Sequence, residues 1–220
     1  MKLKLPDDNF INLTHENYSK IEGDELNEKL QKLFIVFNDD KNKYDVLIKV
    51  AALNKIYSTA ITNINPVVDQ ISKTSRENYK LEKIEDFINY VDKISRIEWK
   101  NEKDENFRRN NLSFASKYVH FLSNKKIPIY DSYIWIVIKG YLGQKNKSKI
   151  VFSNPKNYLE FYDTFCEFKE AFKLGNYSNY QIDKFLWFYG RTLIKDIEKE
   201  LSTDLEKAKN ELKKRIKASL

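Results

Sequence analysis

The chain has 220 residues, 41% of them hydrophobic, which is enough to bury the core of one large domain or two small lobes. The 39 Lys and Arg residues outnumber the 32 Asp and Glu residues, and the net charge of +7 favours phosphate polyanions as partners. The single cysteine, Cys166, excludes an internal disulfide framework, and His15 and His120 are too few for a metal site. We therefore expect a cytoplasmic protein with no metal, cofactor or membrane partner.

Few glycines and prolines interrupt the chain, and apolar residues recur at helical spacing, so the sequence predicts an all-α fold. In chain order, the expected helices span residues 24–37, 43–59, 66–72, 81–98, 111–123, 131–142, 156–173 and 180–220. The last helix is expected to break near Ser202, because Thr203 and Glu206 have the spacing of a capping box. This divides the chain into a helical domain over residues 1–201 and a charged C-terminal helix over residues 202–220. The segment YIWIVI also suits a buried strand, but we assign it to a helix because no partner strand is evident.

Asp131 follows a proline-containing segment and precedes a nearly continuous apolar run. Pro128 biases Ile127 toward an extended backbone, so Asp131 is the first residue that can start a helix, as its N-cap. In one interpretation the aspartate only accepts a hydrogen bond from the next turn. In the other, a carboxylate kept ionised by the helix dipole stabilises a cationic transition state or deprotonates an attacking group.

Two segments carry candidate nucleic-acid contacts. In VAALNKIYSTAI, Asn54 and Lys55 lie at a helix end, where they either form a polar edge or project toward a bound strand. In KGYLGQKNKSK, two glycines accompany the positive charges of Lys139, Lys145 and Lys147. This segment suits a phosphate-contacting loop, although a merely solvated loop has the same composition.

A third segment, QIDKFLWFYGR, is an aromatic helix that ends in Gly-Arg. Trp187 and Phe188 are expected to pack in the core, whereas Tyr189 or Arg191 could face a groove.

Together, LSFASKYVHFLSNKKIPIYDSYIW, VAALNKIYSTAI and DKFLWFYGR resemble the helix-hairpin-helix DNA glycosylase superfamily, in particular small prokaryotic proteins related to 8-oxoguanine DNA glycosylase. The resemblance spans roughly residues 43–191. It implies two helical lobes with a cleft between them, and a base pocket there that includes Tyr133, Trp187 and Tyr189. It further implies that Asp131 is the catalytic aspartate, that Asn54 fills the gap left by an extruded base, and that Arg191 contacts DNA.

The chain departs from this family at two places. The family's glycine-rich hairpin corresponds to ENFRRNNLSF, which has no glycine, so Arg108 and Arg109 are expected to replace amide contacts to phosphate with charge. The family's nucleophilic lysine falls on Leu112 or Ser113. Lys117, about one helical turn later, is the remaining catalytic candidate, with a surface or phosphate-contacting role as the alternative.

The resemblance implies that a monomer flips a damaged base, 8-oxoguanine being the first guess, out of double-stranded DNA and excises it without a cofactor. Two alternatives remain open. One is a catalytically inactive helical DNA-binding or protein-interaction module on the same scaffold. The other is an unrelated helical domain with chance similarity around Asp131.

Overall fold

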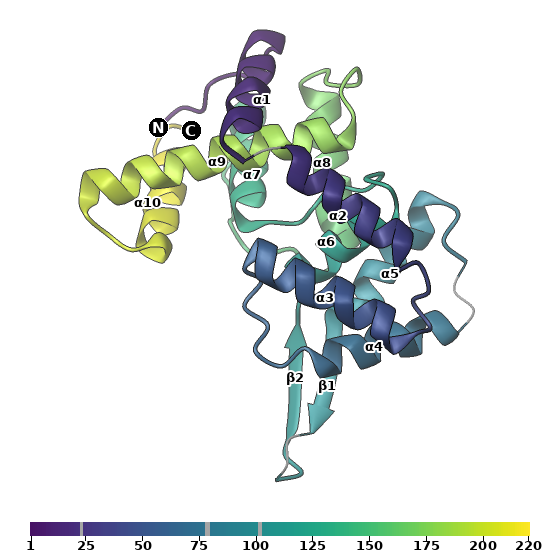
Figure 1. Cartoon of the computed structure of the whole chain (residues 1–220). Coiled ribbons are helices and arrows are strands. Elements are labelled where there is room, and N and C mark those ends of the chain that lie inside the picture. Colours follow the sequence, from purple (N-terminus) through teal and green to yellow (C-terminus); the bar gives the residue numbers. More distant parts are fainter. Residues whose placement is uncertain (23, 78–79, 101–102) are drawn as a thin grey trace. The chain divides into compact units, whose positions relative to one another are not determined.

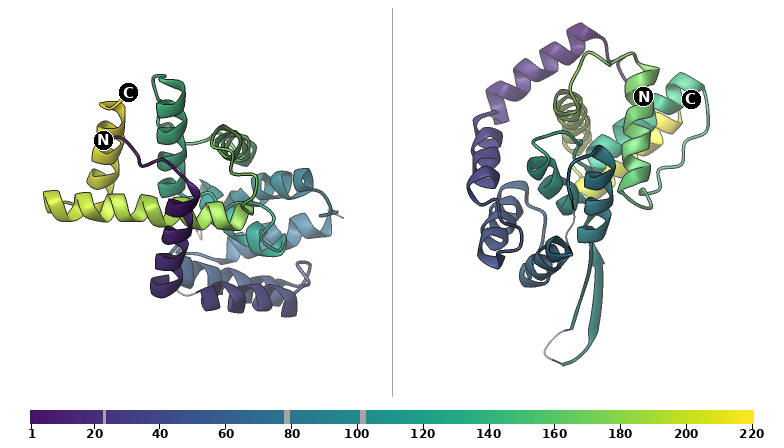
Figure 2. Two further views of the ribbon diagram at one scale, coloured as in Figure 1. Left: turned by 90° about the horizontal axis from the view of Figure 1, so that it is seen from above. Right: turned by 90° about the vertical axis from the view of Figure 1, so that its right-hand side faces the viewer.

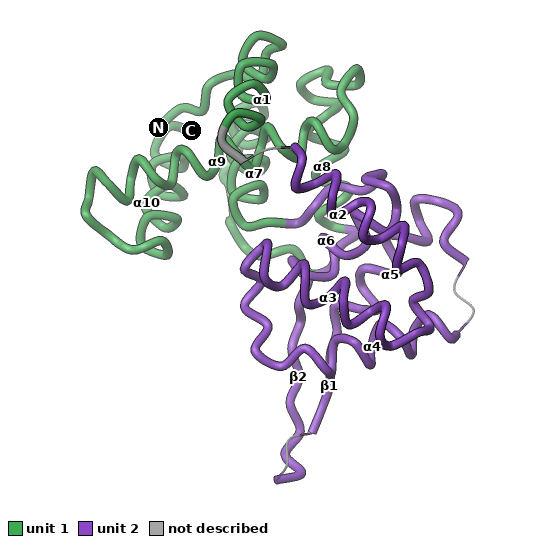
Figure 3. The backbone as a smooth tube through the Cα atoms, in the orientation of Figure 1, with its two compact units in different colours: residues 1–23, 131–156, 160–220 green, residues 24–130, 157–159 purple. Residues whose placement is uncertain are grey.

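The computed structural model describes residues 1–22, 24–77, 80–100 and 103–220 (Figure 1). Its elements are α1 (Asp8–Glu22), α2 (Asp24–Val36), α3 (Lys43–Tyr57), α4 (Asn65–Arg76), α5 (Ile84–Ser95), β1 (Arg96–Lys100), β2 (Asn106–Asn110), α6 (Leu112–Leu122), α7 (Ser132–Asn146), α8 (Tyr158–Ala171), α9 (Asn179–Leu201) and α10 (Leu205–Lys217). Helices dominate, as the sequence predicts. The chain divides into two compact units, shown in Figure 3. Unit 1 comprises Met1–Gly23, Asp131–Lys156 and Glu160–Leu220, and unit 2 comprises Asp24–Tyr130 and Asn157–Leu159.

Unit 2 is a helical layer built around α6 and α3. Helices α2, α3 and α5 pack on α6, and α4 packs on α3 and α5. Its core consists of apolar side chains that recur at helical spacing on these elements: Val46, Val50, Leu53, Val67, Ile71, Phe87, Val91, Ile94, Phe114, Tyr118 and Phe121. The helical spacing of the apolar residues therefore explains how the helices of this unit form a common core.

Unit 1 is organised around α9, which contacts α1, α7 and α10. Both Gly140 and Gly143 lie on α7 where other parts of the unit come close: a Cβ on Gly140 would lie 2.8 Å from the Leu3 side chain, and one on Gly143 would lie 2.2 Å from Ile150. The two glycines of the expected lysine loop thus belong to a helix and allow close packing. No helix among the described residues is long and apolar enough to span a bilayer.

Most expected helices are present, with ends shifted by a few residues. The segment YIWIVI is helical, within α7. The C-terminal break is confirmed at Ser202, which adopts a left-handed conformation with φ 47°. The cap that restarts the chain is Asp204, whose side chain accepts a hydrogen bond from the Lys207 N–H, so the assignment to Thr203 was wrong.

Helix α1 was not expected from the sequence. Its start carries a local signal, since the Asp7 carboxylate accepts a hydrogen bond from the Phe10 N–H at 2.8 Å. Ile11 and Tyr18, one side of α1, are buried. Because only part of the helix is apolar, its stability comes from packing on α9 rather than from a strong local pattern.

A β-hairpin stands where the sequence predicted the end of one helix and a short connection to the next. The helix expected over residues 81–98 ends at Ser95, and Arg96–Lys100 then pairs with Asn106–Asn110 in an antiparallel register. Arg108 and Arg109 consequently lie on β2 and not in a turn between two helices. These two strands were not expected from the sequence, and the aromatic Trp99 is paired with Phe107 across the hairpin.

An ion pair between Lys49 and Asp40 is buried in unit 2. The Lys49 side chain is 0% exposed, and its ammonium lies 5.4 Å from the Phe34 ring centroid and 5.5 Å from that of Tyr118. The Tyr118 hydroxyl donates to the same Asp40 carboxylate at 2.6 Å. Burial, followed by the negative charge of Asp40, raises the pKa of Tyr118 well above its ordinary value. Asp40 therefore neutralises a buried cation and satisfies a buried hydroxyl at once.

We predict that Asp40→Ala lowers the free energy of unfolding by about 3 kcal/mol or more, because it leaves a buried ammonium without its counter-charge. Urea denaturation measures this change. Asp69→Ala is the matched control, since Asp69 pairs with Lys43 but both side chains are more than half exposed, and it is expected to cost less than about 1 kcal/mol. Equal losses in the two variants would contradict the prediction.

Candidate functional site

Asp131 is the N-cap of α7, as the sequence predicts. Its backbone is extended, with φ −140° and ψ 149°, and its carboxylate accepts a hydrogen bond from the Tyr133 N–H at 2.8 Å. The carboxylate is half-buried and sits at the positive end of a helix of 15 residues. This geometry fits both the purely structural and the catalytic interpretation.

Tyr133 is the neighbour of Asp131 with the clearest electrostatic environment. Burial first, and then the negative charges of Asp131, Glu198 and Glu206, raise the pKa of its hydroxyl. The Lys209 ammonium lies 5.5 Å from the centroid of its ring. Carboxylates and a cation from α9 and α10 thus surround the Tyr133 phenol at the start of α7, within unit 1.

Gly190 allows α9 to approach this turn. A Cβ at Gly190 would lie 3.1 Å from the Tyr133 Cβ, the Tyr133 carbonyl oxygen and the Val137 Cγ2. Such distances are tighter than ordinary van der Waals contacts, so a larger residue would push the two helices apart. The Gly-Arg end of the aromatic segment is therefore next to the start of α7, and Gly190 makes this approach possible.

The aromatic residues of α9 have different surroundings. Trp187 is half-buried, three residues before Gly190, and the Arg191 guanidinium lies 4.9 Å from the centroid of its ring. Tyr189 instead packs on Phe10, with ring centroids 5.0 Å apart, and its hydroxyl accepts a hydrogen bond from the Lys4 N–H at 3.0 Å. Of the expected pocket residues on α9, Trp187 lies three residues before Gly190, which packs against Tyr133. Tyr189 instead binds the N-terminal segment through Lys4 and Phe10.

Of the predicted phosphate-contacting lysines, Lys139 lies in the middle of α7, and Lys145 and Lys147 lie at its C-terminal end. Lys139 lies over the Trp135 ring at 5.4 Å, Lys145 is exposed in the last turn, and Lys147 is the left-handed C-cap. With a rise of about 1.5 Å per residue, the 15 residues of α7 separate Lys145 and Lys147 from Asp131 by roughly 20 Å. These lysines are thus not part of the Asp131 cluster.

In unit 2, Asn54 and Lys55 lie at the end of α3, as expected. The Asn54 amide donates to the Ile61 carbonyl at 2.8 Å and accepts from the Thr59 hydroxyl at 2.8 Å and the Ile61 N–H at 3.1 Å. The amide therefore closes the turn that follows α3. Lys55 is exposed beside it and lines a shallow surface depression with Ala60.

Arg109 joins this part of unit 2, because its guanidinium donates to the Ala60 carbonyl at 3.2 Å. Arg108 occupies the other face of the hairpin and forms an ion pair with Glu98 at 2.8 Å. The fold thus places Lys55 and Arg109 beside the same residue, Ala60, although the two are 54 positions apart in the sequence. Only the paired strands create this proximity.

Lys117 lies on α6 in unit 2, whereas Asp131 belongs to unit 1. The lysine side chain is almost completely buried, and its ammonium donates to the Ser113 hydroxyl at 2.7 Å and the Ser113 carbonyl at 3.3 Å. It also lies 5.7 Å from the centroid of the Tyr57 ring. This environment differs from the exposed surface position that was the alternative for Lys117.

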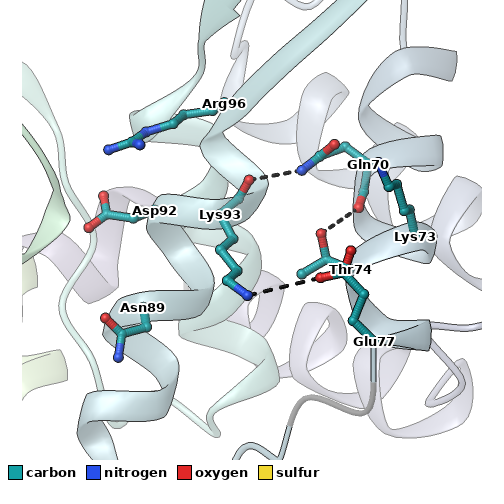
Figure 4. A pocket seen from close by; sticks show the side chains of 8 residues that line it. All are labelled: Gln70, Lys73, Thr74, Glu77, Asn89, Asp92, Lys93 and Arg96. Carbon is teal, nitrogen blue, oxygen red and sulfur yellow. Dashed lines mark hydrogen bonds and ion pairs between the residues drawn. The ribbon is translucent and has the colours of Figure 1, made fainter.

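A polar pocket between α4 and α5 was not anticipated from the sequence (Figure 4). Gln70 donates to the Lys93 carbonyl at 3.0 Å, and the Lys93 ammonium lies 4.0 Å from the Glu77 carboxylate. Asp92 on α5 and Arg96 at the start of β1 also line the pocket. The signal in the sequence is the polar spacing of Asp92, Lys93 and Arg96 opposite the apolar face of α5.

Asp92 has a structural role that reaches α8. Its carboxylate accepts a hydrogen bond from the Tyr158 N–H at 2.7 Å and so caps the first turn of α8 from a distant part of unit 2. Burial raises the pKa of Asp92, although the Tyr158 N–H and the Arg96 charge oppose this effect.

A protein-family model described as the HI_0787_N N-terminal domain matches residues 11–126, just over half of the chain. The chain belongs to this family. The HI_0787_N match includes α2 through α6 and the hairpin, with Asn54, Lys55, Arg109 and Lys117, and ends before Asp131. No curated protein and no solved structure matches the chain.

We predict that Asp92→Asn gains stability relative to the native chain as the pH rises. A carboxyl whose pKa is raised by folding stabilises the protein only while it is protonated, so this contribution is lost as the pH rises through the folded-state pKa. Urea denaturation of both proteins between about pH 3 and pH 7 measures the difference.

Asp86→Asn, on the same helix, is the control of opposite sign. Hydrogen bonds from the Lys83 and Glu82 N–H groups lower the pKa of Asp86, so the native chain should gain stability over this variant as the pH rises. Parallel pH trends in the two variants would show that Asp92 does not titrate as described.

Proposed function

We propose that this protein is a DNA glycosylase-like enzyme that flips a damaged base out of double-stranded DNA and hydrolyses its bond to the sugar, 8-oxoguanine being the first substrate to test. The observation that carries this proposal is the Asp131 carboxylate, fixed at the start of α7 by the Tyr133 N–H and half-exposed. A fixed carboxylate at this position is suited to a reaction in which positive charge develops on a sugar ring.

In the proposed reaction, the bond between C1′ and the base nitrogen breaks and an oxocarbenium-like sugar forms. The Asp131 carboxylate stabilises this cation and accepts a proton from the water that attacks C1′, while the base leaves with the bonding electrons and is then protonated. Base flipping costs a few kcal/mol, which contacts in the pocket and along the DNA backbone offset. In this proposal Tyr133 and Trp187 contact the base, and Arg191, Lys55 and Arg109 contact phosphates.

The proposed role of Asn54 as the residue that fills the vacated base position requires a conformational change. Its amide makes three hydrogen bonds to Thr59 and Ile61 within the turn after α3. Losing them would cost about 1 kcal/mol each in net terms, so insertion into DNA must replace them with bonds to the unpaired base.

We predict that Asp131→Asn reduces single-turnover base excision at least about a hundredfold, because the amide has no charge to stabilise the sugar cation. Stability should change little, since asparagine is an equally good N-cap and keeps the acceptor for the Tyr133 N–H. Excision is measured on duplexes containing 8-oxoguanine, uracil or alkylated purines, with hot alkali to reveal abasic sites.

Asp204→Asn is the matched control, because Asp204 caps α10 through the Lys207 N–H in the same way. It should excise at the native rate. Full activity in Asp131→Asn would exclude the catalytic role of Asp131, and absence of excision by the native chain on every duplex would exclude the glycosylase.

We also predict that borohydride traps no covalent adduct between the native chain and a damaged duplex. The Lys117 ammonium is buried and bonded to Ser113, so it is not positioned to attack C1′, and excision would use water. The measurement is a shift of the labelled DNA band in a denaturing gel. An adduct that disappears in Lys117→Met would instead establish a lyase activity.

A second candidate function is a catalytically inactive helical module that binds DNA or a protein on the same scaffold. It is favoured by the internal use of Asn54 and Lys117 and by the β-hairpin that connects α5 to α6 in place of a short glycine-rich turn. Equal affinity for undamaged, abasic and 8-oxoguanine duplexes, with a steep dependence on salt, would support this module.

A further inference from the structure

The hairpin formed by β1 and β2 has two chemically different faces. Directly paired residues of an antiparallel ladder lie on the same face, so the pairs Ile97 with Arg109 and Trp99 with Phe107 share one face, and Glu98 with Arg108 lies on the other. We call the first the aromatic face. In Figure 1 and the right-hand view of Figure 2, the hairpin extends away from the helices of its own unit.

The aromatic face carries a stacked pair of rings that is partly open to solvent. The Trp99 and Phe107 rings are 5.5 Å apart between centroids, with planes at 17°. Phe107 is 41% exposed and Trp99 is half-buried, while Ile97 beneath them is buried near α4. The pair therefore presents flat aromatic surface where another planar group can stack.

The charges next to these rings select a negatively charged ligand. Among the paired residues Arg96–Lys100 and Asn106–Asn110, Arg109 is the only charged residue on the aromatic face. Its hydrogen bond to the Ala60 carbonyl directs it toward the loop that begins beside Lys55. The carboxylate on the paired strands, that of Glu98, lies on the opposite face and is neutralised by Arg108. A polyanion along the aromatic face thus meets cations and no strand carboxylate.

We propose that the aromatic face binds unpaired nucleotides of a nucleic-acid strand, with a base stacked on the Trp99–Phe107 pair and phosphates beside Arg109 and Lys55. Stacking on aromatic side chains combined with basic phosphate contacts is how single strands are bound without reading their sequence. The inference extends the proposed function, and only the choice of DNA as the nucleic acid rests on that function. A DNA strand that is opened around a flipped base contains such unpaired nucleotides.

The test is the anisotropy of labelled oligothymidylate and oligouridylate on titration with the full chain. Phe107→Ala should weaken binding about tenfold, because it removes one stacking surface, and Phe107→Tyr should restore it. Arg109→Gln should weaken binding and reduce the slope of log affinity against log salt by about one phosphate contact. A difference between the two oligonucleotides identifies the preferred polymer, and either preference supports the proposal.

The matched control is the double variant Lys100→Gln, Asp104→Asn, which removes an exposed ion pair of the hairpin away from the aromatic face and leaves the net charge unchanged. It should bind within about twofold of the native chain. The proposal is overturned if the native chain binds neither oligonucleotide, if Phe107→Ala and Arg109→Gln bind normally, or if the control loses as much affinity as they do. The last outcome would indicate that binding of the oligonucleotide is not specific to the aromatic face.

This test separates the inference from the proposed function. If binding depends on the hairpin but no damaged base is excised, the proposed glycosylase activity is wrong and the aromatic face remains a nucleic-acid site. If the native chain excises a base but Phe107→Ala and Arg109→Gln leave its affinity for the oligonucleotides unchanged, the proposed function stands and the proposed binding face is wrong.

Discussion

Hydrogen bonds hold the backbone of three of the four residues that precede Asp131. The His120 Nδ1–H donates to the Ile127 carbonyl, the Tyr158 hydroxyl donates to the Pro128 carbonyl, and the Tyr130 N–H donates to the Ser116 hydroxyl. This segment is buried, so its backbone groups require such partners. Asp131, the next residue, therefore begins α7 from a backbone that has little freedom, which is what a preorganised carboxylate needs.

Several of the 39 Lys and Arg residues are not accessible to a polyanion. Lys49, Lys117 and Lys184 are buried, and each lies over at least one aromatic ring. Lys139 and Lys209 also lie over rings. These lysines contribute to folding through ion pairs, hydrogen bonds and cation–π contacts. The proposed recognition of nucleic acid consequently depends on the exposed cations, among which Lys55 and Arg109 both lie beside Ala60.

The candidate carboxylate, that of Asp131, lies outside the residues that match the HI_0787_N family model. The matched residues 11–126 contain the hairpin, the end of α3 and Lys117, and Asp131 follows a few residues later. The proposed binding by the hairpin and the proposed catalysis at Asp131 therefore involve different residues, and substitutions can test them separately.

The sequence by itself determined the helices with strong apolar periodicity and the start of α7, because a proline and an aspartate act on their own neighbouring peptides. The tertiary structure alone decided the hairpin, because β1 and β2 are stable only when paired and neither has a strong pattern of its own. It likewise decided the burial of Lys49 and Lys117 and the internal bonds of Asn54. A side chain's type shows which bonds it can form, but its accessibility depends on contacts between segments that are distant in the sequence.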